Sequence, residues 1–102
     1  MIIVGGAFEV EPSERDAFVA SRLDAMRASR AEAGNLEYVI APDPVDPGRV
    51  VLYERWEDQA ALDTHLANLR SGGGSGGSGG AAVAPTSASI VVYDASESSR
   101  IA

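Results

Sequence analysis

His65 has the most adaptable chemistry in this sequence, because an imidazole can bind or release a proton near neutral pH. It is the only histidine of the chain, and there is no cysteine. One imidazole without any thiolate cannot supply the usual ligand sets of zinc or non-heme iron. We therefore expect no metal and no bound cofactor. The other side chains suited to chemistry are one tryptophan, three tyrosines and several arginines.

The position of His65 allows two interpretations. A helix is predicted from an N-cap at Asp58 to about residue 70, and Ala61, Leu62, His65, Leu66 and Leu69 fall on its apolar face. In the first interpretation His65 is a core histidine that makes one hydrogen bond. In the second it is a general base, or an orienting donor, in a pocket between this helix and a sheet. The spacing alone favours the first interpretation.

Four further residues are candidates for substrate binding. Trp56, Tyr38 and Tyr53 are expected in strands, where aromatic side chains usually pack in a core or an interface. A pocket lined by tyrosine and tryptophan would also suit a flat aromatic ligand. Arg22 lies beside the apolar stripe of the first predicted helix, so it either extends along that surface or binds an anion.

The predicted elements alternate in a recognisable order. A helix is expected from an N-cap at Ser13 to a stop at Gly34, and "DPVDPG" (43–48) has the composition of a hairpin turn. β-rich runs are found at 2–10, 36–42, 49–56 and 87–94. The order βαββαβ predicts an α+β, ferredoxin-like fold, with a four-stranded antiparallel sheet covered on one face by the helices.

A Gly/Ser-rich stretch, "GGGSGGSGG" (72–80), separates the second helix from the last strand. The residues that follow are too few to form a core of their own, so we predict a single domain over 1–102 with an internal flexible loop at 71–80. The stretch has the composition of a laboratory linker as well as of natural low complexity, and both origins stay open.

The strands also make a prediction about assembly. In "IIV", "VVLY" and "SIVV" apolar residues do not alternate with polar ones, which indicates that both faces of the sheet are buried. So short a chain has nothing left to cover the second face. We therefore expect a second copy of the chain to cover it, giving a two-fold symmetric homodimer.

The charge bears on other partners. The net charge is −7 and there is no lysine, which argues against binding to nucleic acid or to an anionic membrane. No apolar run approaches the roughly 20 residues that a membrane span needs. The chain opens on "MIIVGGAFEV" without a basic leader, so we expect a cytoplasmic protein.

Two stretches resemble the antibiotic biosynthesis monooxygenase family. "VLYERWEDQAALDTHLA" (51–67) has the family's strand ending E-x-W-x-[DES], followed by a helix with A-L-x-x-H-L. "EAGNLEYVIAPDPVDPGRVVLYERW" (32–56) fits its glycine turn, second strand and hairpin. The resemblance covers residues 1 to about 68.

The resemblance implies a dimeric α+β barrel with a pocket between sheet and helices in each subunit. Characterised members oxidise quinols and polycyclic aromatic polyketides with O2, without metal or flavin. The family's helix histidine corresponds to His65 and its strand tryptophan to Trp56. The resemblance thus suggests His65 as the catalytic residue, and a small aromatic molecule and O2 as substrates.

The sequence also departs from the family pattern. Arg70 stands where many members have a second histidine. Heme-degrading relatives have an asparagine and a tryptophan where this chain has Ala7 and His65, so heme degradation is not expected. Two other functions stay open: a non-catalytic dimeric module that binds a ligand or serves as a scaffold, and an isomerase of a small carbonyl compound.

Overall fold

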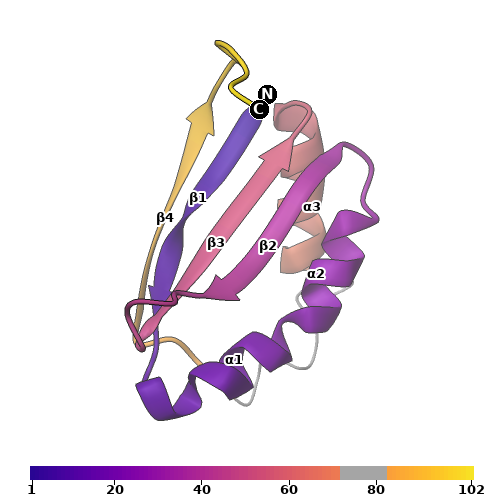
Figure 1. The fold of residues 1–102 in the computed structure, drawn as a ribbon. Helices are drawn as coiled ribbons and strands as arrows, with labels where there is room; N and C mark the ends of the chain where they lie inside the picture. Colours follow the sequence, from indigo (N-terminus) through magenta and orange to yellow (C-terminus); the bar gives the residue numbers. More distant parts are fainter. Residues whose placement is uncertain (72–82) are drawn as a thin grey trace.

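The computed structural model of the chain describes residues 1–71 and 83–102. One antiparallel sheet of four strands has the order β2-β3-β1-β4. The helices α1 and α2 pack on β2 at one edge, α3 packs on β3, and β4 forms the other edge (Figure 1). The predicted α+β, ferredoxin-like fold is confirmed. The elements are β1 (Ile2–Glu9), a 3-10 turn (Pro12–Glu14), α1 (Arg15–Ser21), α2 (Leu23–Arg30), β2 (Asn35–Pro42), β3 (Arg49–Trp56), α3 (Gln59–Arg70) and β4 (Ser87–Asp94).

The two faces of the sheet differ in burial. On β3, Val50, Leu52 and Trp56 point toward the helices and are at most 5% exposed. Tyr53 and Tyr93 point the other way and are 36% and 53% exposed. In the single chain the second face is therefore uncovered, although the strand composition had indicated burial on both faces.

The prediction of one continuous first helix was wrong. Pro12–Glu14 forms a 3-10 turn, so Ser13 is not an N-cap, and the following helix is divided at Arg22 into α1 and α2. The hydroxyl of Ser21 donates to the carbonyl oxygen of Phe18 at 2.6 Å, and this side-chain bond competes with regular helix hydrogen bonding at the division. At the division, Arg22 has φ −100° and ψ −1°, which depart from the regular α-helical values within the right-handed helical region.

The helix also ends earlier than predicted, at Arg30. Gly34 lies in the following turn with φ 82°, a left-handed conformation that favours glycine. A Cβ at Gly34 would lie 2.5 Å from the Cβ of Ala61, so α3 passes directly over this turn. Gly34 therefore sets the approach of α3 rather than the end of the first helix.

The other local predictions agree with the structure. The side chain of Asp58 caps α3 by accepting a hydrogen bond from the backbone amide of Ala61 at 2.9 Å. At Gly6, a Cβ would collide with the backbone of Ser89 and Ile90, so this glycine allows β4 to pass close to β1. The predicted loop at 71–80 lies, apart from Ser71, outside the described residues. No helix among the described residues is long and apolar enough to cross a membrane.

Candidate functional site

A cavity of about 270 Å³ lies between α3 and the sheet. Most of its wall is apolar, and three side chains with ionisable groups reach it: His65, Glu54 and Tyr38. Ile90 and Val92 of β4 also line it and are 41% and 51% exposed, so the cavity opens beside that edge strand. The remaining lining residues are Val4, Phe8, Leu52, Leu62, Leu66 and Leu69.

His65 points inward from α3 and is 1% exposed. Its Nδ1 lies 2.7 Å from Oε1 of Glu32, and the other oxygen of Glu32 accepts a hydrogen bond from Asn68 at 3.0 Å. An ionised carboxylate can only accept hydrogen bonds, so Nδ1 is the nitrogen that donates to Glu32. Within residues 1–71 and 83–102, no side chain or backbone group is hydrogen-bonded to Nε2. In the neutral form of the ring that donates from Nδ1, Nε2 has the lone pair.

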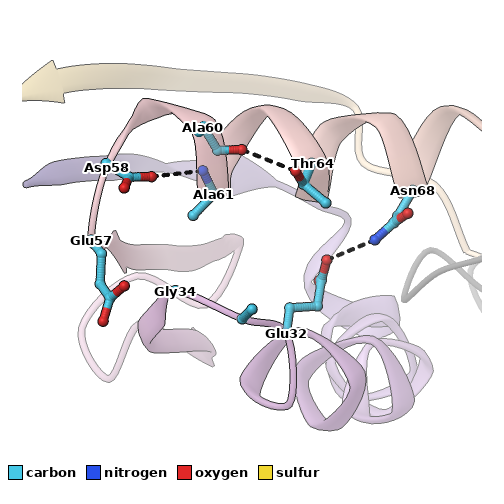
Figure 2. Close-up of a pocket in the computed structure, with 9 residues that line it drawn as sticks. Glu32, Gly34, Glu57, Asp58, Ala60, Ala61, Thr64 and Asn68 are labelled. Atoms are coloured by element: carbon cyan, nitrogen blue, oxygen red, sulfur yellow. Dashed lines mark hydrogen bonds between the residues drawn. The ribbon is translucent and has the colours of Figure 1, made fainter.

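Glu32 connects the buried histidine to the outside of the molecule. It follows α2, and its side chain is 18% exposed. On its far side is an open groove of about 460 Å³, which Glu57, Asp58 and Asn68 also line. Figure 2 shows Glu32 at the wall of this groove with Asn68 donating to it. The carboxylate of Glu32 thus contacts His65 and also lines the open groove.

Glu54 is a second buried carboxyl group at the cavity. It lies on β3 two residues before Trp56, on the same face of the strand, and is 5% exposed. Its Oε1 accepts a hydrogen bond from Nε1 of Trp56 at 2.9 Å. Burial raises the pKa of Glu54, while the bond from Trp56 and the positive charge of a protonated His65 oppose that rise. Glu54 therefore keeps its proton to higher pH than an ordinary glutamate.

The aromatic neighbours of His65 have different positions. Tyr38 lines the cavity from β2, and its ring centroid is 5.6 Å from that of His65 in an edge-to-face arrangement. Burial, together with the negative charge of Glu54, raises the pKa of Tyr38 to about 12, so its hydroxyl keeps its proton. Trp56 is fully buried, with its ring centroid 4.8 Å from that of His65, and it is not part of the cavity wall. Trp56 packs against the ring of His65 and donates a hydrogen bond to Glu54, so it supports both side chains.

Two predicted binding residues lie elsewhere. Tyr53 is on the opposite face of the sheet, because side chains alternate along β3. Arg22 lines a neighbouring cavity of about 160 Å³, which shares Phe8, Tyr38 and Leu69 with the first.

Sequence reasoning missed Glu32 and Glu54. The signal for Glu54 was available, since a residue two positions before a buried strand tryptophan shares its face. Nothing in the sequence pairs Glu32 with His65, which is 33 residues away.

The fold and this site together define a class: a small ferredoxin-like protein with an imidazole–carboxylate pair against an apolar cavity. The sequence model of the family "Antibiotic biosynthesis monooxygenase" matches residues 1–70. The chain therefore belongs to the antibiotic biosynthesis monooxygenase family. Residues 1–70 include β1 to α3 and so both members of the His65–Glu32 pair.

Two curated relatives match the same part of the chain. "Putative monooxygenase YcnE" of Bacillus subtilis is 31% identical over 65 residues, which cover 64% of this chain and 68% of the relative. "Uncharacterized protein sll1783" of Synechocystis is 31% identical over 65 residues, which cover 64% of this chain and 44% of that protein.

Solved structures match over nearly the whole chain. A Deinococcus radiodurans protein described as a "putative antibiotic biosynthesis monooxygenase" aligns with a TM-score of 0.78 and 23% identity, covering 100% of this chain and 99% of the other. The structure of Rv0793 from Mycobacterium tuberculosis aligns with a TM-score of 0.69 and 23% identity, covering 97% and 98%. At these identities the likeness establishes the fold.

Proposed function

We propose that this protein is a cofactor-independent monooxygenase that oxidises a quinol or a polycyclic, polyketide-type phenol with O2. One observation carries the proposal: a buried His65, held by Glu32 at 2.7 Å, lies in the wall of an apolar cavity. The family membership agrees with this chemistry.

The first step in the proposed reaction is a proton transfer. Nε2 of His65 removes a proton from a hydroxyl group of the substrate, and the resulting imidazolium is stabilised by the Glu32 carboxylate. The histidine is the base and Glu32 is a positioning residue. Glu32 also borders the open groove, so a proton accepted by His65 has a short route to solvent.

The second step transfers electrons from the substrate anion to O2. One electron passes to O2, and the substrate radical and superoxide form a carbon–oxygen bond. The resulting peroxide anion takes back the proton held by His65, and the hydroperoxide then loses water to give a quinone-type product. One oxygen atom enters the product and the other becomes water. The substrate supplies all four electrons, so no added reductant is needed. An apolar wall favours this chemistry because it keeps bulk water from the reactive anion.

Tyr38 and Glu54 supply the polar contacts inside the cavity. The pKa of Tyr38 is raised to about 12, so its hydroxyl is available to donate a hydrogen bond to an oxygen of the substrate. Burial raises the pKa of Glu54, and this carboxyl group can donate in its protonated form. Two donors and one base in an otherwise apolar wall suit a flat aromatic ring with more than one oxygen substituent.

The proposal includes a homodimer. On the sheet face away from the helices, Tyr53, Val91 and Tyr93 are 36%, 45% and 53% exposed. A second copy placed face to face would remove this apolar surface from water and close the sheet into a two-chain barrel. The cytoplasmic location expected from the sequence stays a prediction.

The test of the proposed reaction is O2 uptake with a panel of anthrones and hydroquinones. We expect substrate-dependent uptake by the native protein and a loss of about 100-fold or more in His65→Ala, because general base catalysis contributes that much. His65→Gln keeps a polar side chain of similar size in case His65→Ala does not fold. Thr64→Ala, on the outer side of α3, is the matched control. Equal uptake by native protein and His65→Gln would refute a base role, and a native protein without substrate-dependent uptake would be left as a ligand-binding module.

A further inference from the structure

Arg22 differs from the other arginines in its environment. Arg15, Arg27, Arg30, Arg49, Arg55 and Arg100 each donate to a protein acceptor, and Arg70 is exposed at the end of α3. The guanidinium of Arg22 lies 4.7 Å above the Phe18 ring. Its Nε is buried, and no described residue accepts a hydrogen bond from it. A buried donor without an acceptor is unfavourable, and a bound ligand could supply the acceptor.

The position of Arg22 connects this unpaired charge to the candidate active site. Arg22 lines the smaller cavity, and that cavity shares Tyr38, Phe8 and Leu69 with the larger one that contains His65. The positive charge of Arg22 also opposes the rise in the pKa of Tyr38 that burial and Glu54 cause. A ligand that extends past Tyr38 would have His65 at one end and Arg22 at the other.

We propose that Arg22 forms an anion-binding subsite, and that the substrate is an aromatic hydroxy acid whose carboxylate is held by Arg22 while its hydroxyl faces His65. This inference rests on the proposed function for the role of the hydroxyl. An arginine fork matches a carboxylate in shape and charge. In a protein of net charge −7, an unpaired cation beside an apolar cavity provides local attraction for an anion that the rest of the surface would repel.

The test measures binding, so it does not depend on turnover. The probes are 6-hydroxy-2-naphthoate and its neutral carboxamide, titrated by calorimetry into the native protein at low salt. We expect the carboxylate to bind at least about tenfold more tightly, because a hydrogen bond to a charged group contributes roughly that much. Arg22→Met should weaken binding of the carboxylate by about 10- to 100-fold and leave binding of the carboxamide unchanged. Arg22→Lys should restore part of the difference.

Arg27→Met is the matched control, because Arg27 lies on α2 in an exposed ion pair with Asp24. The proposal is overturned if the carboxylate binds no more tightly than the carboxamide, if neither probe binds, or if Arg22→Met weakens both equally. If Arg22→Met does not fold, the native ratio and Arg22→Lys decide. Selective carboxylate binding without any O2 uptake would keep the subsite and remove the monooxygenase, so the two failures are distinguishable.

Discussion

At the residue scale, the bond between Glu32 and His65 decides what the imidazole can do. A histidine that donates from Nδ1 has its lone pair on Nε2, and here that nitrogen belongs to a side chain in the cavity wall. Without the carboxylate the ring could turn or exchange tautomers, and the base would be correctly oriented only part of the time.

Nitrogen NMR tests this tautomer directly, because the chain has one histidine and the signals need no assignment. We expect a neutral ring with a protonated Nδ1 and an unprotonated Nε2 at pH 8. Glu32→Ala should give a mixture of tautomers, whereas Glu57→Ala, in the same groove but without a bond to His65, should leave the spectrum unchanged. A protonated Nε2 in the native protein would contradict the proposed base.

Glu54 gives a prediction about stability and pH. Its pKa is raised by burial, so between the unfolded and folded pKa values the folded state binds more protons than the unfolded state. The contribution of this group to stability is therefore present at low pH and is lost as pH rises through the folded pKa. Glu54→Gln removes the ionisation and keeps an acceptor for Trp56.

We expect Glu54→Gln to gain stability relative to the native protein as pH rises from 4 to 8, as measured by urea unfolding. Glu57→Gln, exposed and next to Trp56 in the sequence, is the control and should show no such trend. A relative stability that stays flat or falls with pH would show that Glu54 is not a buried acid of raised pKa.

At the scale of elements, contacts at the first turn of α3 fix the position of this helix on the rest of the fold. Asp58 caps its first turn, and Gly34 allows the turn before β2 to pass beneath Ala61. These contacts place His65 over the sheet and within reach of Glu32. A displacement of α3 would separate the pair.

Gly34→Ala should cost about 1–3 kcal/mol, because alanine is strained at a φ of 82° and its Cβ meets Ala61. A double-mutant cycle measured by urea unfolding separates the two causes. Ala61→Gly should recover the part due to the collision, while Ala60→Gly, one residue earlier and exposed, should show no coupling. Additive costs for Gly34→Ala and Ala61→Gly would mean that α3 does not rest on this turn.

Local signals in the sequence predicted local features well. The cap at Asp58, the hairpin turn and the apolar face of α3 depend on neighbours within a few residues, and all agree with the structure. The division at Arg22 depends on one hydroxyl bond of Ser21, which no propensity encodes. The pairing of Glu32 with His65 is a tertiary contact, so pattern analysis had no means to find it.

At the scale of the whole molecule, the uncovered sheet face is the main feature that one chain leaves unexplained. We expect light scattering at micromolar concentration to give the mass of a dimer. Tyr53→Glu places a charge in the proposed interface and should shift the protein toward monomer, whereas Leu23→Glu, at an exposed apolar position on α2, should not. A native protein that scatters as a monomer would refute the homodimer.

The proposed reaction needs only the protein chain, O2 and an electron-rich phenol, with His65 as the base. The most direct measurement is turnover of anthrone under ¹⁸O2 by protein treated with a chelator, with no reductant added. We expect one ¹⁸O atom in the quinone product and one O2 consumed for each anthrone. His65→Gln should lose both the labelled product and the O2 consumption. Product without the label, or the same labelled yield from His65→Gln, would contradict the proposed reaction.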